Sequence, residues 1–159
     1  MKKDYLKDLA EATKILLEEP DVKKIIMKLK VQIQKSTEPF AWRTIEINNL
    51  KDRLPPEFQS IWVFVLKRNF PSVAHYHPNS IQHTVMVDGK GRVKINKQYK
   101  ELKLFNPKND ECWCIIDKNM PHEFYPKESE IVVISFHTCL SKELIEIRCD
   151  THEQRLYEP

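Results

Sequence analysis

Short runs of alternating apolar and polar residues fill the chain after Pro39, and this pattern most limits the folds it can adopt. Successive side chains of a strand point to opposite faces, so a period of two predicts strands with a buried and an exposed face. The expected strands are residues 42–47, 60–67, 72–77, 82–88, 91–96, 101–105, 111–116, 122–125 and 131–138. Residues 143–149 also alternate and fit either a strand or a helix.

Many short strands separated by turn-forming residues are typical of an antiparallel β-sandwich or small β-barrel. The chain begins differently, because apolar residues in 4–19 follow helical spacing. Pro20 ends that helix and Asp21 is expected to cap a second one, which from Leu29 either continues or gives way to a strand. Both helices are expected to pack outside the sheets and cover an edge.

The expected organisation is therefore one mainly β domain with a helical N-terminal extension. Its parts are a helical extension at residues 1–38, a β-barrel at residues 39–150 and a C-terminal tail at residues 151–159.

Composition excludes several classes of function. The chain has 159 residues and only two glycines, Gly89 and Gly91, so it holds no glycine-rich phosphate-binding loop. A net charge of +3, with mixed signs along the chain and no basic aromatic stripe, argues against nucleic-acid binding. No apolar stretch is long enough to span a membrane, and acidic residues interrupt the N-terminus, so a cytoplasmic protein is expected.

Three of the six histidines form a candidate metal site. His75 and His77 are two residues apart, so on a strand both imidazoles point to the same face. Gln82 and His83 occupy opposite faces of the next strand, and His122 begins a distant one. Imidazole is the commonest ligand for transition metals, and an oxygen atom can fill a further position. These residues predict a metal site with positions left for water or substrate.

The stretch from His75 to Gly89 resembles the first motif of the cupin superfamily, G-x5-H-x-H-x3-4-E-x6-G. His75 and His77 match its histidine pair, Gln82 takes the acidic position, Gly89 matches the last glycine, and Asn69 lies near the place of the first.

Residues 111–126 are similar to the second cupin motif, with His122 at its histidine. The turn at residues 116–121 replaces the usual proline and glycine, so Asn119 and Gly89 are expected to adopt positive φ angles. The resemblance covers roughly residues 40–140 and implies a double-stranded β-helix, the cupin jelly roll.

The resemblance also implies one divalent transition metal, preferably Fe(II), with Zn, Mn or Ni as alternatives. The implied ligands are His75, His77, Gln82 and His122, with His83 as an alternative to Gln82. Gln82 in place of glutamate removes one negative charge from this ligand set. A glutamine here resembles small cupins that ketonise unsaturated uronates, whereas an incomplete acidic ligand resembles three-histidine iron dioxygenases acting on thiols or diketones.

Two classes of function follow. The first is an enzyme acting on a small organic substrate, either a dioxygenase, which is slightly preferred, or an isomerase or ketonising enzyme of a sugar-acid-like substrate. His137 and Glu123 are the candidate acid–base residues. The second is a cupin that binds or senses a small ligand without catalysis and holds a structural or regulatory metal. In that case the N-terminal helices would dock a partner or form a homodimer.

Overall fold

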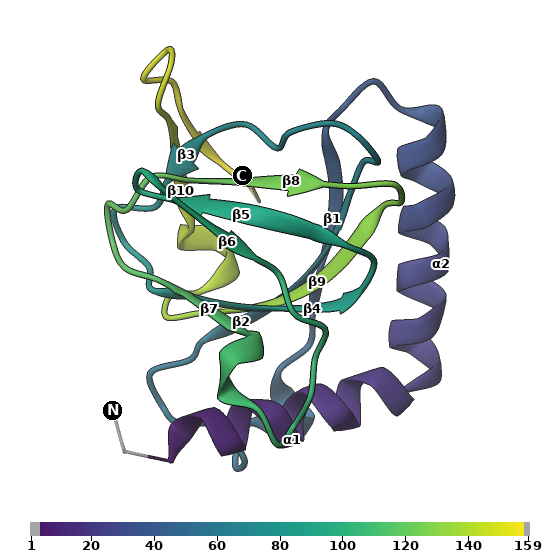
Figure 1. Cartoon of the computed structure of the whole chain (residues 1–159). Coiled ribbons are helices and arrows are strands. Elements are labelled where there is room, and N and C mark those ends of the chain that lie inside the picture. The colour runs from purple at the N-terminus through teal and green to yellow at the C-terminus, as the bar shows by residue number, and fades with distance from the viewer. Residues whose placement is uncertain (1–3, 158–159) are drawn as a thin grey trace.

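The computed structural model describes residues 4–157, which form two antiparallel β-sheets and two helices (Figure 1). The helices are α1 (Tyr5–Glu18) and α2 (Pro20–Lys35). The strands are β1 (Phe40–Ile45), β2 (Ser60–Leu66), β3 (His75–Tyr76), β4 (Gln82–Asp88), β5 (Gly91–Ile95), β6 (Gln98–Glu101), β7 (Trp113–Ile116), β8 (His122–Pro126), β9 (Ile131–His137), β10 (Ile145–Arg148) and β11 (Gln154–Leu156). Three 3-10 turns lie at Asn48–Leu50, Asp110–Cys112 and Ser141–Glu143.

The two sheets face each other and enclose part of the core. One has the strand order β1-β2-β9-β4-β7, and the other has the order β11-β10-β3-β8-β5-β6. Several neighbours in these orders are far apart in the chain, as β2 and β9 show, so the sheets depend partly on long-range pairing. The expectation of a mainly β, antiparallel fold is confirmed.

The central strands of the first sheet are buried on both faces. In β2, Ile61 and Val63 belong to the cluster beneath the helices, whereas Trp62 and Leu66 belong to clusters between the sheets. This double burial explains why the residues of β2 are almost all apolar.

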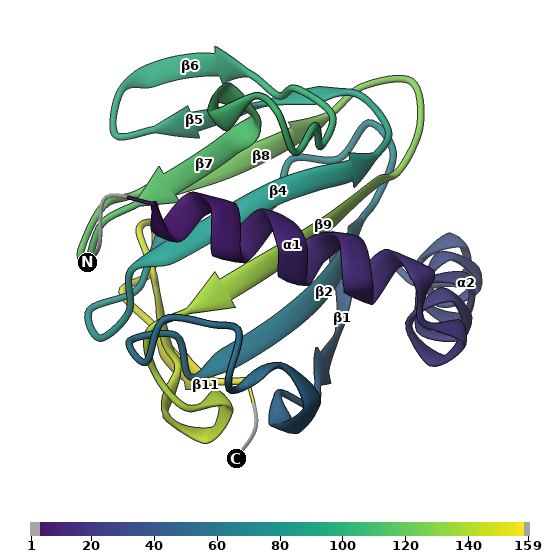
Figure 2. The same ribbon diagram turned by 90° about the horizontal axis from the view of Figure 1, so that it is seen from below.

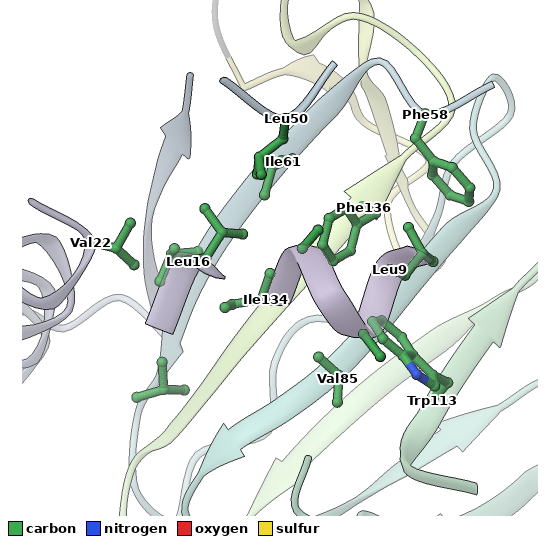
Figure 3. Close-up of a cluster of buried hydrophobic side chains, with 14 of the residues drawn as sticks. Leu9, Leu16, Val22, Leu50, Phe58, Ile61, Val85, Trp113, Ile134 and Phe136 are labelled. Carbon is green, nitrogen blue, oxygen red and sulfur yellow. The ribbon is translucent and has the colours of Figure 1, made fainter. Parts of the chain in front are cut away.

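Helix α1 lies across the outer face of the first sheet (Figure 2). Its buried side includes Leu9 and Leu16, which pack with Val85, Ile134 and Phe136 of the sheet (Figure 3). Burying a leucine contributes about 1.5–3 kcal/mol, so this face holds the helix against the sheet. Helix α2 packs beside β1, the edge strand, as expected of a helix that covers an edge.

Helix α2 differs in detail from the sequence prediction. Pro20 does not merely end α1, because it is also the first residue of α2, and Glu19 rather than Asp21 is the N-cap. Proline suits this position because its missing N–H would have no intrahelical partner there. Past Leu29 the chain continues as helix to Lys35.

The predicted strand at residues 101–105 is wrong, because the strand lies earlier. Asn96 has a φ of 58°, and Ile95 pairs with Gln98 across a two-residue hairpin. This turn brings residues 98–101 into the ladder. Residues 143–149, which by their sequence fit either a strand or a helix, contain strand β10 after a 3-10 turn. Strand β11, in the segment expected to be a tail, pairs with β10.

Among residues 4–157, neither helix combines the length and apolar character that a transmembrane segment requires.

Candidate metal centre

Three buried histidines converge between the sheets. His75 of β3 pairs in register with His122 of β8, and His77 follows directly after β3. Each is at most 7% exposed. One nitrogen from each ring lies within 4.8 Å of the others, so the three side chains could hold a metal ion. The spacing His75-x-His77 therefore does place both rings on one side of the chain.

A backbone carbonyl fixes the orientation of each imidazole ring by binding its Nδ1 atom. The Nδ1 atoms of His75, His77 and His122 lie 2.6, 2.8 and 3.0 Å from the backbone carbonyls of Val73, Ile145 and Met120. A carbonyl can only accept, so each Nδ1 carries the proton and each Nε2 keeps its lone pair. Metal-binding histidines are oriented by this kind of contact.

The histidine cluster favours neutral imidazoles. Burial, reinforced by neighbouring histidines, lowers the pKa of His77 and of His122 to about 3. Burial and then His122 lower the pKa of His75 well below its ordinary value. Neutral imidazole is the form that binds a metal.

Gln82 lines the same cavity as the three histidines. Its Nε2 donates to Thr84 Oγ1 at 2.7 Å, and Thr84 Oγ1 lies 2.6 Å from Ser135 Oγ. This contact leaves Gln82 Oε1 buried with no hydrogen-bond partner, and His122 Nε2 is in the same state. An unpartnered buried acceptor is costly, and a bound cation would satisfy both atoms. The three histidines could therefore hold a metal ion, and Gln82 lines the same cavity with a free acceptor oxygen.

The alternative ligand His83 does not reach this cavity. It lies on the opposite face of β4, where its Nε2 is 2.9 Å from Tyr5 Oη and its ring packs edge-on against Phe58. No bulge at Gln82 and His83 moves them to a common face, because both stay in register with β9.

Glu123, one candidate acid–base residue, also faces away from the cavity. It alternates with His122 on β8, and its carboxylate accepts a hydrogen bond from Tyr125 Oη on the outer face. The strand period that points His122 inward points Glu123 outward.

The other candidate, His137, does line the cavity and is 1% exposed. Its ring centre lies 5.3 Å from that of His77, and its Nδ1 is 2.8 Å from Ser80 Oγ. Burial, then His77, lower its pKa well below the ordinary value.

The cavity itself is small and carries no formally charged side chain among the residues described. Its volume is about 30 Å³, which is enough for one or two water-sized groups. Besides the four histidines and Gln82, its lining is largely aromatic and aliphatic: Phe40, Phe64, Leu66, Ser72, Phe124, Val133, Ser135 and Tyr157.

Two residues near the site were missed by reasoning from the sequence. Tyr157, from the expected tail, is 7% exposed and lines the cavity. Glu146 of β10 is buried, and its Oε1 lies 3.4 Å from His75 Nδ1. The only sequence signal for Glu146 is its place between Ile145 and Ile147 on an alternating strand.

Left-handed turns hold the chain around the site. The predicted positive φ angles are confirmed at Gly89, with 100°, and at Asn119, with 62°. The N–H of Asn119 donates to the carbonyl of His77 at 2.9 Å, which ties the turn before His122 to the other ligand segment. Asn69, near the place of the first motif glycine, also has a positive φ of 59°.

No protein-family model matches the sequence, and no curated protein matches it. Several solved structures share its fold at low identity. A protein of Acidithiobacillus ferrooxidans that has been assigned as a sugar phosphate isomerase is 10% identical, with a TM-score of 0.50 over 77% of this chain and 80% of its own.

The salicylate 1,2-dioxygenase of Pseudaminobacter salicylatoxidans is also 10% identical, with a TM-score of 0.54 over 72% of this chain. The coconut allergen cocosin is 16% identical, with a TM-score of 0.54 over 71% of this chain. This chain spans 33% of the dioxygenase chain and 29% of the cocosin chain. These structures are cupin jelly rolls, so the fold implied by the sequence resemblance is confirmed.

Proposed function

We propose that this protein is a mononuclear metal-dependent cupin enzyme that acts on a small organic substrate. The observation that carries the proposal is the common orientation of three buried imidazoles. Their Nδ1 atoms are bound to backbone carbonyls, and one nitrogen from each ring lies within 4.8 Å of the others, which leaves Nε2 as the atom free to bind a metal. If the cluster only stabilised the fold, Nε2 of His122 would be expected to have a hydrogen-bond partner, and it has none among the described residues.

The proposed ligands are His75, His77, Gln82 and His122, and the preferred metal is Fe(II), with Zn, Mn or Ni as alternatives. All four donors are neutral, so the set favours a substrate that brings its own anionic oxygen or sulfur atom. When bound, Fe(II) would supply the redox chemistry that a reaction with O₂ requires.

The lining favours dioxygenase-type chemistry over isomerisation of a sugar acid. Recognition of a carboxylate or phosphate usually relies on Arg or Lys, and no Arg or Lys of residues 4–157 lines the cavity. Phe40, Phe64 and Phe124 instead offer an apolar wall that excludes water. We therefore favour a small, largely apolar substrate. Because the volume of about 30 Å³ holds only one or two water-sized groups, only the reacting part of that substrate would enter the cavity.

His137 is the proposed proton carrier. It is neutral, lines the cavity and contacts the Ser80 hydroxyl, which can hold its ring in place. A neutral imidazole can accept a proton from a substrate hydroxyl or thiol.

The test begins with metal content. Purified protein should bind one Fe(II) or Zn(II) per chain, and the double variant His77→Ala/His122→Ala should bind none. The variant His152→Ala changes an exposed histidine outside the cavity and serves as the matched control. Equal metal content in all three proteins would exclude the proposed site.

The second measurement is oxygen uptake by the Fe(II)-loaded protein with a panel of small phenols, diketones and thiols. Uptake should depend on both the metal and a substrate. If the metal-free and Fe(II)-loaded forms consume oxygen equally with every compound, dioxygenase chemistry is excluded. The small cavity also suits ligand binding without catalysis, and metal-dependent binding without turnover or substrate proton exchange would favour that function.

A further inference from the structure

Glu146 is the only buried acidic residue in the described part of the chain, residues 4–157, and is 2% exposed. It lies on β10, directly beside the strand that carries His75. Burying an ionised carboxylate is costly unless charged and polar partners compensate for the lost water. Its partners therefore indicate why the chain keeps it there.

Three groups surround the carboxylate. Arg155, its register partner on β11, places Nε 2.5 Å from Oε2. Tyr157 donates its hydroxyl to Oε1 at 2.5 Å. The Nδ1 of His75 lies 3.4 Å from the same Oε1 and 2.6 Å from the carbonyl of Val73. The carboxylate thus links the C-terminal strand to the back of one proposed ligand.

The proposed ligand set lacks the negative charge that a glutamate at position 82 would provide. No acidic side chain of the described residues lines the cavity, so Glu146 is the nearest buried source of negative charge behind the proposed ligands. A carboxylate behind an imidazole increases the basicity of its other nitrogen and fixes the ring orientation.

We infer that Glu146 is a positioning residue that supplies, through His75, the negative charge missing at Gln82, and that Arg155 moderates this charge. The inference rests on the proposed metal site. It gives the C-terminal segment a role in metal affinity besides its role in packing, because Arg155 lies on β11 and Tyr157 follows that strand directly.

A purely structural role makes a different prediction. If Glu146 only fastens β11 to β10, then Glu146→Gln and Arg155→Gln should both lower the melting temperature and neither should change metal affinity. If Glu146 supplies charge, the two variants should change metal affinity in opposite directions. Glu146→Gln keeps the shape and an acceptor for Tyr157, so its main effect is the loss of charge.

The experiment measures the dissociation constant for Zn²⁺ at neutral pH, by competition with a chromophoric chelator, beside the melting temperature of each variant. Glu146→Gln should weaken binding by about 10–100-fold, the range typical of a residue that supports a metal ligand. Arg155→Gln should tighten binding even though it weakens the contact between β10 and β11. Adding Gln82→Glu to Glu146→Gln should restore part of the lost affinity.

Unchanged affinity in Glu146→Gln, or weaker binding in Arg155→Gln, would overturn the inference. If Glu146→Gln does not fold, the sign of the change in Arg155→Gln decides alone. Failure of the metal site itself is distinguishable, because the wild-type protein would then bind Zn²⁺ no better than His77→Ala/His122→Ala.

Discussion

Acidification should destabilise the metal-free protein strongly, because its buried histidines resist protonation. The perturbation is a change from about pH 7.5 to about pH 5 with a chelator present. The ordinary histidine pKa of 6.5 falls to about 3 in His77 and in His122. At the lower pH the unfolded chain therefore binds protons that the native protein does not bind.

The direction follows from the depressed native pKa values. Stability is fully present above the unfolded value of 6.5 and is lost as the pH falls toward about 3. At about pH 5 each of the two residues costs about 2 kcal/mol, so together they cost about 4 kcal/mol. His75 and His137 act in the same direction. The total is a large part of the roughly 5–15 kcal/mol by which a typical domain is stable.

Urea unfolding followed by tryptophan fluorescence is the assay, because Trp62 is fully buried and Trp113 is 4% exposed. The unfolding midpoint should fall steeply between about pH 6.5 and about pH 5. His77→Gln removes one of the titrating groups and should make this dependence shallower. Added Zn²⁺ should raise the midpoint more at the higher pH, because metal binding needs neutral imidazoles. A midpoint that stays constant over this range would refute the reasoning.

Three further predictions concern turns and thiols. Gly89→Ala should lower the free energy of unfolding by more than about 2 kcal/mol. The reason is that φ at this residue is 100° and the new Cβ would lie 2.5 Å from the Glu130 carbonyl oxygen. Urea unfolding measures the change, and an unchanged free energy of unfolding would contradict the prediction. Asn119→Ala should cost about 1 kcal/mol and weaken Zn²⁺ binding, whereas Asn119→Gly should leave binding intact. In a thiol-labelling time course at about pH 8, half-buried Cys149 should react first, because the other three cysteines are buried and burial raises the pKa of Cys114 to about 11. Burial also raises the pKa of Cys149, so its labelling should be slower than that of a free thiol. Labelling of Cys114 before Cys149 would contradict this.

Most local features of the protein could be predicted from its sequence alone, apart from the strand expected at residues 101–105 and the N-cap expected at Asp21. Period-two alternation indicated most of the strands, and helical spacing indicated α1 and the start of α2, because both patterns arise among residues a few positions apart. The common orientation of His75 and His77 and the turn at Gly89 also depend only on residues a few positions apart in the sequence. His122 and Gln82 came from the spacing of the cupin motifs, and both line one cavity with His75 and His77.

Which side chains share that cavity depends instead on the tertiary structure. His83 and Glu123 lie beside proposed ligands in the sequence, yet the alternation of β4 and β8 points them away from the cavity. Glu146 and Tyr157 are about 70 or more residues from His75 along the chain. The pairing of β10 with β3 and β11 brings Glu146 to His75 and Tyr157 into the cavity lining. Such contacts depend on long-range strand register, which a local pattern does not encode.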